Sequence, residues 1–298
     1  MKAINPKDVS VRELHGYLLS AVAPRPIAFA STIDEEGRPN LAPFSFFNIF
    51  SVNPHIAIFS PARRGRDNTT KHTFENVKTV AEAVINIVTY DMVQQCSLAS
   101  AEFPEGVSEF EKSGLTPIDS DLVRPKRVKE SPVQLECRVN EVIELGQNGG
   151  AGNLVVCEIL KVHISEDVLN AEGKIDPLKM DQVGRCGGNW YSRVNAASMF
   201  EVEKPLARMG IGVDGIPEDI RLSKVLTGND LGILGSVESL PNETDVNEYK
   251  LIELAEVFME LEGDQHALEQ KLHDMAHDQL LAGKAEEAWK TLLTFNNR

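Results

Sequence analysis

Residues 24–61 read "PRPIAFASTIDEEGRPNLAPFSFFNIFSVNPHIAIFSP", three apolar runs separated by short polar segments. The runs 26–32 and 41–50 contain aromatic and β-branched residues and flank "DEEGRPN", where Gly37 gives the backbone the freedom that a tight turn needs. A third run of the same kind covers residues 55–61 and ends in proline. This stretch therefore predicts three β-strands joined by short turns.

The same texture continues to about residue 205. Residues 73–88 begin with a helical pattern and turn β-branched, and residues 132–145 and 153–164 alternate apolar and polar side chains on either side of "GQNGGAG". Several short strands with few helices are typical of a β-barrel or a β-sandwich. We therefore expect residues 1–205 to form one mainly β domain with a few helices.

Residues 206–298 have a different pattern and form a predicted α-helical extension. Residues 245–263, 264–283 and 284–295 carry apolar side chains at i, i+3 and i+4 spacing, with glycines as stops. Residues 209–241, which precede these helices, fit either packing over the barrel or docking of a partner.

The helical extension contains the motif "HDMAH" at residues 273–277, in which two histidines lie one helical turn apart. A zinc protease motif needs glutamate in the second position, and Asp274 is shorter. No third ligand is evident in the sequence, so we expect no metal site. Leu268, Leu272 and Met275 are expected to face the core, which leaves the histidine face in solvent.

The composition argues against several classes of function. The 298 residues carry a net charge of −15, which disfavours binding to nucleic acid or to an anionic membrane surface. No apolar run is long enough for a membrane span, and the first residues lack the apolar region of a secretory signal. The four cysteines are far apart in sequence, so we expect reduced thiols and a cytoplasmic location.

Residues 60–78 read "SPARRGRDNTTKHTFENVK" and concentrate basic side chains in an acidic protein. Arg63, Arg64 and Lys71 precede a predicted helix whose N-cap we place at Thr73. Free backbone N–H groups and the positive end of the helix dipole, together with basic side chains, are typical of a phosphate site. A solvated surface loop is the alternative interpretation.

The neighbouring run 41–50 places Phe46 and Phe47 between the polar residues Ser45 and Asn48. Two adjacent phenylalanines break the alternation of a strand, which predicts a bulge at this point. Aromatic faces and hydrogen-bonding groups suit a planar heteroaromatic ring, and the basic loop suits its phosphate. The combination predicts a flavin or pyridoxal phosphate site, whereas the strand taken alone favours plain core packing.

Three stretches, in this order, resemble one known family: residues 23–61, "TTKHTFENVKTVAEAVINIV" at 69–88, and "QVGRCGGNWYSRV" at 182–194. The family is that of the flavin reductase-like, FMN-binding split-barrel proteins, which includes flavoredoxin, and the resemblance covers residues 4–200. It implies a mainly β fold with helices, a split β-barrel of Greek-key topology that binds FMN, followed here by the C-terminal α-helical extension. It also implies a homodimer with FMN near the dimer interface.

Carried over to this sequence, the resemblance implies a set of FMN contacts. Residues 45–48 would lie along the isoalloxazine ring, and Lys71 and Thr73 would hold the phosphate. His72 stands where the family usually has aspartate, and a histidine could itself donate to phosphate. Arg25 fits a structural salt bridge at a strand end equally well. The full set of candidate FMN residues is Arg25, Ser45, Phe46, Phe47, Asn48, Ser60, Arg63, Arg64, Lys71 and Thr73.

The resemblance also places His163 on a late strand, where related reductases have residues near the nicotinamide, although a purely structural role is open for it. Trp190 and Tyr191 could line the pocket or an interface. Residues 146–153 lack the G-x-G-x-x-G spacing and are followed by a strand, so we interpret them as a mobile hairpin loop. No dinucleotide-binding βαβ unit is evident, so NAD(P)H is expected only as a transient substrate.

We therefore expect an NAD(P)H-dependent flavin reductase, in which hydride passes from nicotinamide C4 to N5 of FMN. A protein such as a monooxygenase is a possible acceptor of the electrons. An FMN-holding electron carrier, or a redox-responsive binding protein without efficient NAD(P)H turnover, is the alternative. Oxidation of pyridoxamine phosphate uses a similar barrel and FMN, but the resemblance is to the reductases.

Overall fold

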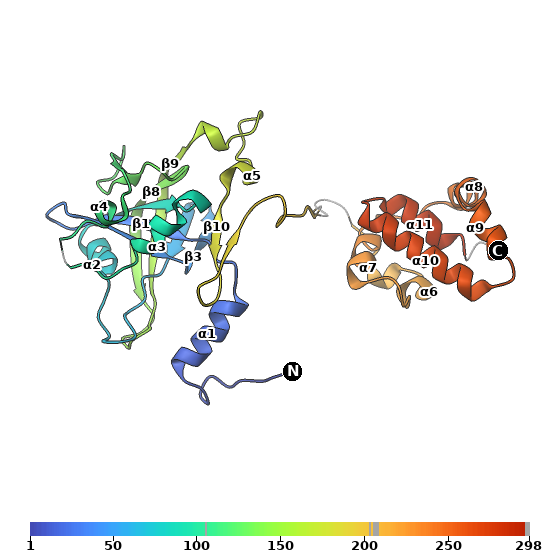
Figure 1. Ribbon diagram of the computed structural model, residues 1–298, viewed down its shortest axis with the longest axis horizontal. Helices are drawn as coiled ribbons and strands as arrows, with labels where there is room; N and C mark the ends of the chain where they lie inside the picture. The colour runs from blue at the N-terminus through green and yellow to red at the C-terminus, as the bar shows by residue number, and fades with distance from the viewer. Residues whose placement is uncertain (105, 203, 205–208, 296–298) are drawn as a thin grey trace. The chain divides into compact units, whose positions relative to one another are not determined.

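A computed structural model describes residues 1–104, 106–202, 204 and 209–295 of the chain (Figure 1). The chain forms two compact units, Met1–Phe200 and Glu201–Arg298. The division lies five residues before the boundary expected from the change in sequence pattern. We call the first the barrel unit and the second the helical unit, and describe each by itself.

The barrel unit is built on one seven-stranded sheet in the order β2-β1-β5-β8-β9-β4-β3. Every neighbouring pair in this sheet is antiparallel. The strands are β1 (Ala28–Ile33), β2 (Pro39–Phe44), β3 (Phe47–Val52), β4 (His55–Phe59), β5 (Glu82–Ile87), β8 (Val133–Glu144) and β9 (Asn153–Ile164).

The sheet is curled, because its two edge strands are joined by only two residues. β2 and β3 lie at opposite ends of the strand order, yet only Ser45 and Phe46 connect them. Such a connection spans at most about 10 Å, whereas the edges of seven flat strands would be about 29 Å apart. The sheet therefore curls into a barrel whose two edge strands approach each other at Ser45–Phe46. We call this connection the barrel corner.

This corner corrects two expectations from the sequence. The run 41–50 was expected to be one strand, but it is divided between β2 and β3. The bulge predicted at Phe46–Phe47 is also wrong, because the register shift in β3 lies between Ile49 and Ser51. The unusual alternation marks the place where the chain leaves one edge of the barrel and starts the other.

Apolar residues pack on both faces of β1, whose six residues are all buried. Ala28 and Ala30 point into the barrel, where small side chains leave room for Phe59 and Ile85. On the other face Phe29 belongs to a second apolar cluster with residues of short outer helices. These are α3 (Val93–Leu98), α4 (Glu109–Ser113) and the 3₁₀ turn η1 (Tyr90–Met92), whereas α2 (His72–Thr79) contributes Val77 to the barrel core.

The N-terminal helix α1 (Val11–Ala21) was missed in the sequence, although Ser10 and Glu13 carry the S-x-x-E pattern of a capped helix start. Ser10 Oγ accepts a hydrogen bond from Glu13 N at 3.1 Å. The other small elements of the unit are β6 (Pro117–Ile118), β7 (Arg127–Val128), η2 (Glu166–Val168), α5 (Pro177–Met180), β10 (Val183–Arg185) and β11 (Tyr191–Arg193).

The helical unit has its own apolar core, centred on Trp289, which is 1% exposed. The indole Nε1 donates a hydrogen bond to Leu234 O at 3.1 Å. Ile216 and Ile220 join this core, so residues 211–237 pack within the helical unit. Its elements are η3 (Val213–Gly215), α6 (Glu218–Arg221), α7 (Gly228–Leu234), α8 (Glu243–Glu253), α9 (Ala255–Glu260), α10 (Gln265–Leu281) and α11 (Ala285–Leu293). No helix in the described parts of the chain is long and apolar enough to cross a membrane.

The histidines of "HDMAH" do not form a solvent face, so that expectation was wrong. His273 is 5% exposed, and its Nδ1 lies 2.7 Å from Ser223 Oγ. His277 Nδ1 lies 3.0 Å from Asp230 Oδ2. The segment 218–234, whose helical periods are too short to stand out in the sequence, supplies these partners to α10.

Acidification is expected to destabilise the helical unit through His273. Burial lowers the pKa of His273 below its usual value of 6.5, although Glu269, Asp219 and Asp274 partly oppose this. A histidine with a lowered pKa favours folding above pH 6.5, and this contribution is lost as the pH falls towards the folded pKa. Thermal unfolding followed by circular dichroism at stepped pH should show this loss, and His273→Gln should reduce it. An identical pH profile in the variant would contradict the assignment.

Candidate functional site

The barrel corner brings the predicted ring-binding residues to an open edge. Phe46 is 44% exposed and Asn48 is exposed, whereas Phe47 is half-buried and packs against the barrel core. The ring of Phe46 meets that of His15 on α1 edge to face, with 6.1 Å between centroids. The corner therefore presents an aromatic ring and polar groups beside one another, as a planar ligand would require.

Arg25 links the barrel corner to the end of α1. It is 6% exposed, and its Nη1 donates to Leu19 O at 2.5 Å and to Val22 O at 2.7 Å, at the end of α1. Its Nε lies 3.4 Å from Ser45 Oγ. Burial and the nearby Arg185 lower the pKa of Arg25. The structural salt bridge considered for Arg25 is thus replaced by bonds to carbonyls, and its contact with a cofactor stays a prediction.

Ser60 joins the corner to the basic loop, residues 61–71. Its backbone N donates to Phe46 O at 2.9 Å, and its buried Oγ accepts from Asn153 N at 3.1 Å. Asn153 also donates from Nδ2 to Pro61 O at 2.8 Å. These bonds hold the first turn of the basic loop against the aromatic edge.

The arginines of the basic loop are largely used to shape it. Arg63 donates from Nε to Asn68 Oδ1 and from Nη2 to Asn68 O, both at 2.9 Å. Arg64 donates from Nη1 to Thr69 Oγ1 at 3.1 Å and to Thr70 O. The two guanidinium groups therefore fix the conformation of the loop and lie close to the residues that precede α2.

Lys71 differs from the arginines of the loop, because no hydrogen bond or ion pair of its ammonium group is found in the described part of the chain. It is half-buried, its Nζ lies 5.8 Å from the centroid of Phe44, and it forms no ion pair with any side chain in the described part of the chain. Burial and then repulsion by Arg64 lower the pKa of Lys71 below its usual range. A half-buried ammonium group without a partner is costly, and a bound phosphate would satisfy it.

Thr73 does not cap α2, so that prediction was wrong. The N-cap residue is Lys71, and α2 begins at His72. Thr73 is 1% exposed, and its Oγ1 accepts a hydrogen bond from Asn40 Nδ2 at 2.9 Å. The Thr73 hydroxyl is therefore buried and already bonded to Asn40. A contact between Thr73 and phosphate stays a prediction.

The loop "GQNGGAG", interpreted from the sequence as a mobile hairpin loop, is hydrogen-bonded to the basic loop. Arg63 N donates to Ala151 O at 2.8 Å, and Gly150 N donates to Arg63 O at 3.0 Å. A Cβ atom on Gly149 would lie 3.1 Å from Arg64 O, so this close approach of the two backbones favours glycine. The run of glycines indicated that another part of the backbone comes close, but the sequence did not show that this part is the basic loop.

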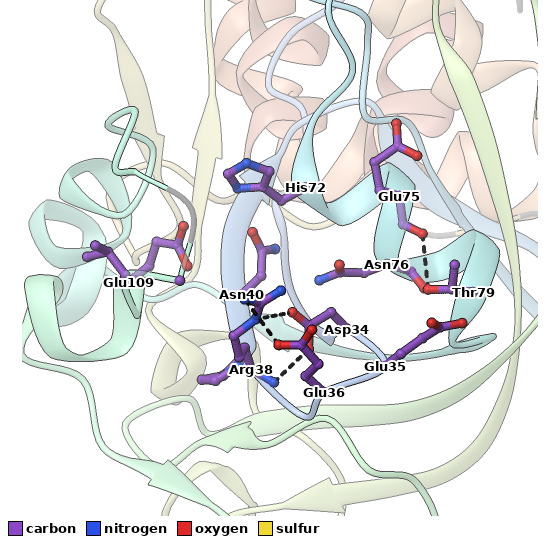
Figure 2. Close-up of a pocket in the computed structure, with 13 residues that line it drawn as sticks. Asp34, Glu35, Glu36, Arg38, Asn40, His72, Glu75, Asn76, Thr79 and Glu109 are labelled. Carbon is purple, nitrogen blue, oxygen red and sulfur yellow. Dashed lines mark hydrogen bonds and ion pairs between the residues drawn. The ribbon is translucent and has the colours of Figure 1, made fainter.

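A cavity of about 360 Å³ on another side of α2 has the opposite charge (Figure 2). Its lining includes Asp34, Glu75 and the buried Glu109, whose pKa is raised by burial. His72 also lines this cavity (Figure 2). Such an acidic lining disfavours phosphate, so the predicted anion site is expected on the Lys71 side of the helix start, whereas His72 lies among carboxylates.

The structure does not bring His163 to the corner. His163 Nε2 lies 2.6 Å from Glu136 Oε1. It is near the end of β9, about 30 Å along the strand from Asn153. Asp121 completes the one group of three potential metal ligands among the described residues, but Glu136 already accepts from the backbone N of Asp121 and Leu122, and Asp121 from Lys161. A nicotinamide role for His163 stays a prediction.

Glu102 was missed because it lies outside every motif in the sequence. Its carboxylate is 3.4 Å from Arg64 Nε and 3.0 Å from Arg66 Nη2. It therefore competes with any anion that approaches the basic loop. We expect Glu102→Gln to tighten phosphate-bearing ligands about twofold to fivefold, as is typical for an exposed ion pair. Titration with FMN measures the effect, and weaker binding would contradict this role.

Comparison with known proteins agrees with this fold. Residues 20–185 match the model of the flavin reductase like domain, so the chain belongs to this family. An uncharacterized protein of Aquifex aeolicus is 34% identical over 185 residues, which cover 62% of this chain and 92% of that protein. Residues 201–298 lie outside the family match.

Two solved structures illustrate the fold. Nitrilotriacetate monooxygenase component B from Bacillus cereus has a TM-score of 0.63 at 29% identity, and the match covers 68% of this chain and 98% of that one. Flavoredoxin of Desulfovibrio vulgaris has a TM-score of 0.53 at 19% identity, covering 70% and 98% of the two chains, and shows likeness of fold alone. The mainly β split barrel with C-terminal helices, expected from the sequence, is thus confirmed.

Proposed function

We propose that the protein binds FMN at the barrel corner and is a flavin reductase that uses NADH or NADPH. The observation that carries the proposal is the half-buried Lys71, which has no ion-pair partner in the described chain and lies over Phe44, the last residue of β2 before the corner at Ser45–Phe46. FMN has both features that this arrangement would recognise, a planar ring and a terminal phosphate. When bound, FMN supplies the hydride chemistry, and the protein supplies binding and orientation.

The residues present suit the phosphate. Lys71 would donate from Nζ, and the free N–H groups of His72 and Thr73 at the start of α2 would add to it, since the first helical N–H groups have no acceptor within their own helix. Arg63 and Arg64 hold the loop in place through their bonds to Asn68 and Thr69. The pKa of Lys71 would rise when the dianion binds, because the opposite charge favours the ammonium form.

The residues present also suit the ring. The exposed Phe46 offers an apolar contact, and Asn48, whose Oδ1 accepts from Ile49 N at 2.8 Å, keeps its amide N–H groups available to a polar ring edge. Arg25 would keep Ser45 in position without facing solvent. A nicotinamide would approach the flavin ring from the side on which Phe46 and Asn48 are exposed.

A homodimer and an external acceptor complete the proposal. Ile49, Phe50 and Val52 on the edge strand β3 are 47%, 64% and 78% exposed, which favours burial of this edge in a subunit contact. The similar Bacillus cereus protein is named as a monooxygenase component, so a monooxygenase is a reasonable acceptor. The four free cysteines are compatible with the reducing cytoplasm.

Anaerobic reduction of the FMN-loaded protein tests the proposed reaction. We expect NADH or NADPH to bleach the flavin absorbance within seconds, whereas the same nucleotide without protein should bleach FMN much more slowly. A flavin that stays oxidised with both nucleotides, but is reduced by dithionite, would overturn the reductase proposal and favour an electron carrier.

A further inference from the structure

A second cavity of about 360 Å³ lies on the outer hairpin β10–β11 and differs in charge from the acidic cavity. Its polar lining includes Arg185, Arg193, Tyr90, Tyr191, Gln94 and Asn189. No carboxylate is among its lining residues, although the chain as a whole carries a net charge of −15. In an acidic protein, a cavity whose charged groups are all guanidinium groups is suited to an anionic ligand.

The ladder of strands connects this cavity with the barrel corner. Arg25 and Arg185 are direct antiparallel partners, and Arg185 is in turn the direct partner of Tyr191. Directly opposed residues of a sheet point to the same face, so the three side chains form one row. Arg25 contacts Ser45 at 3.4 Å, and neighbouring strands are about 5 Å apart, so Tyr191 lies about 10 Å across the sheet from Arg25.

The two arginines of the cavity are bound differently. Arg193 is held by Asp181, with Nε 2.6 Å from Oδ1 and Nη2 2.7 Å from Oδ2, and it covers the ring of Tyr90 at 3.7 Å. Arg185 donates from Nη1 to Trp190 O at 3.1 Å and lies 4.7 Å from the ring centroid of Tyr191, and it has no carboxylate partner among the described residues. Arg185 therefore keeps guanidinium donors for an anion.

The tyrosines supply the apolar part of the cavity. Tyr90 and Tyr191 are 48% and 39% exposed, so parts of both rings are open to a ligand. Each ring is already paired with a guanidinium group, an arrangement that also suits an aromatic base. Gln94 and Asn189 are exposed and carry amide donors and acceptors for the edge of such a base. The lining as a whole suits an aromatic base attached to phosphate.

We propose that this cavity binds the adenosine phosphate half of the NAD(P)H that reduces the flavin, with Arg185 on a phosphate and Tyr191 beside the adenine ring. This inference rests on the proposed reductase function. A dinucleotide has a planar ring at each end and a diphosphate between them. The row has the same order: the corner at Ser45, where the nicotinamide would meet the flavin, then Arg185 for a phosphate, then Tyr191 for the adenine. The chain obtains a nucleotide site in this way without the glycine-rich turn of a dinucleotide-binding βαβ unit.

Binding of ADP-ribose to the full-length, FMN-loaded protein tests the site without any redox reaction, because this probe lacks the nicotinamide. Calorimetry should give a dissociation constant that rises about 10- to 100-fold in Arg185→Gln, as expected for loss of a charge-assisted contact. Arg138→Gln removes the same charge from the exposed face of β8, where Arg138 pairs with Glu158 at 2.7 Å, and should bind ADP-ribose normally. Arg185→Lys should recover part of the affinity.

Steady-state kinetics of Arg185→Gln and ADP-ribose binding to Tyr191→Leu test the same site independently. Arg185→Gln should raise KM for the nucleotide about tenfold or more with little change in kcat or in FMN affinity. Tyr191→Leu should weaken ADP-ribose binding, whereas Tyr17→Leu on α1 should not. No ADP-ribose binding to the wild type at millimolar concentration, or equal binding in Arg185→Gln and wild type, would overturn the site.

The two proposals fail separately. If neither nucleotide reduces the flavin, yet ADP-ribose binding depends on Arg185, the site stands and the reductase reaction is wrong. If the flavin is reduced and Arg185→Gln changes neither KM nor ADP-ribose binding, the reaction stands and the site is wrong.

Discussion

Replacement of Lys71 by glutamine is expected to weaken FMN binding about 10- to 100-fold, since a charge-assisted bond to phosphate is lost. Lys71 is half-buried beside Phe44 and has no ion-pair partner in the described chain. Riboflavin has the same ring without the phosphate, so its affinity should change little in the variant. The effect therefore reports the phosphate contact and not a general loss of the fold.

Fluorescence titration of wild type and variant with both flavins measures this prediction. Arg66→Gln is a matched control, because it removes the same charge from the same loop, but Arg66 already pairs with Asp67 and Glu102 at 3.1 and 3.0 Å. Equal losses of FMN and riboflavin affinity in Lys71→Gln, or a larger effect of Arg66→Gln, would contradict the assignment of Lys71.

The same lysine predicts a pH dependence of FMN affinity. Burial and Arg64 lower the pKa of free Lys71 below its usual value of 10.5. Phosphate binds the charged form, so affinity should be full at neutral pH and should decline as the pH rises through this lowered pKa. The decline should be absent in Lys71→Gln.

The second large effect is expected in the helical unit, where Trp289→Ala should lower the free energy of unfolding by about 3–5 kcal/mol. Trp289 is 1% exposed, and its truncation leaves a large cavity. It also leaves the buried carbonyl of Leu234 without the indole donor. A loss of this size is comparable to the whole stability of many small domains.

Urea unfolding followed by far-ultraviolet circular dichroism should show an earlier transition for the helical signal in Trp289→Ala. Trp190→Ala is the matched control, because Trp190 is 78% exposed and its loss should change stability by less than about 0.5 kcal/mol. FMN affinity should persist in Trp289→Ala, because every candidate FMN residue lies in the barrel unit. Equal losses of unfolding free energy in Trp289→Ala and Trp190→Ala would contradict the placement of Trp289 in the core of the helical unit.

The sequence was sufficient to predict the strands with clear alternation and the long helices with clear spacing. β8 (Val133–Glu144) and β9 (Asn153–Ile164) fall almost residue for residue on the alternating runs. α10 (Gln265–Leu281) follows from the spacing of its leucines and the glycine after it. These patterns are local, so each run carries the information for its own element.

The features that depend on distant contacts were not predictable. The corner at Ser45–Phe46 exists because seven strands curl until their edges meet, which no window of ten residues records. The burial of His273 depends on Ser223, fifty residues earlier in the chain. α1 is a different case, because its capping pattern is local and was overlooked, and none of its residues is buried in this chain.

The sequence predicted that the aromatic corner and the basic loop lie near each other, but not the hydrogen bonds among their residues. The corner residues and Lys71 do lie together, as the combination of aromatic strand and basic loop suggested. The use of Arg63 and Arg64 within the loop, the bond from Asn40 to Thr73 and the carboxylate of Glu102 at the arginines depend on tertiary packing. Residue type predicted which groups gather at the corner, and geometry decides which of them are left for a ligand.

The most direct test of the account is the affinity of the wild-type, full-length protein for FMN and for riboflavin, measured by equilibrium titration at neutral pH. The account predicts that both flavins bind and that FMN binds at least about tenfold more tightly, because only FMN reaches Lys71 and the start of α2. No flavin binding, or equal affinities for the two, would contradict a phosphate site at the barrel corner.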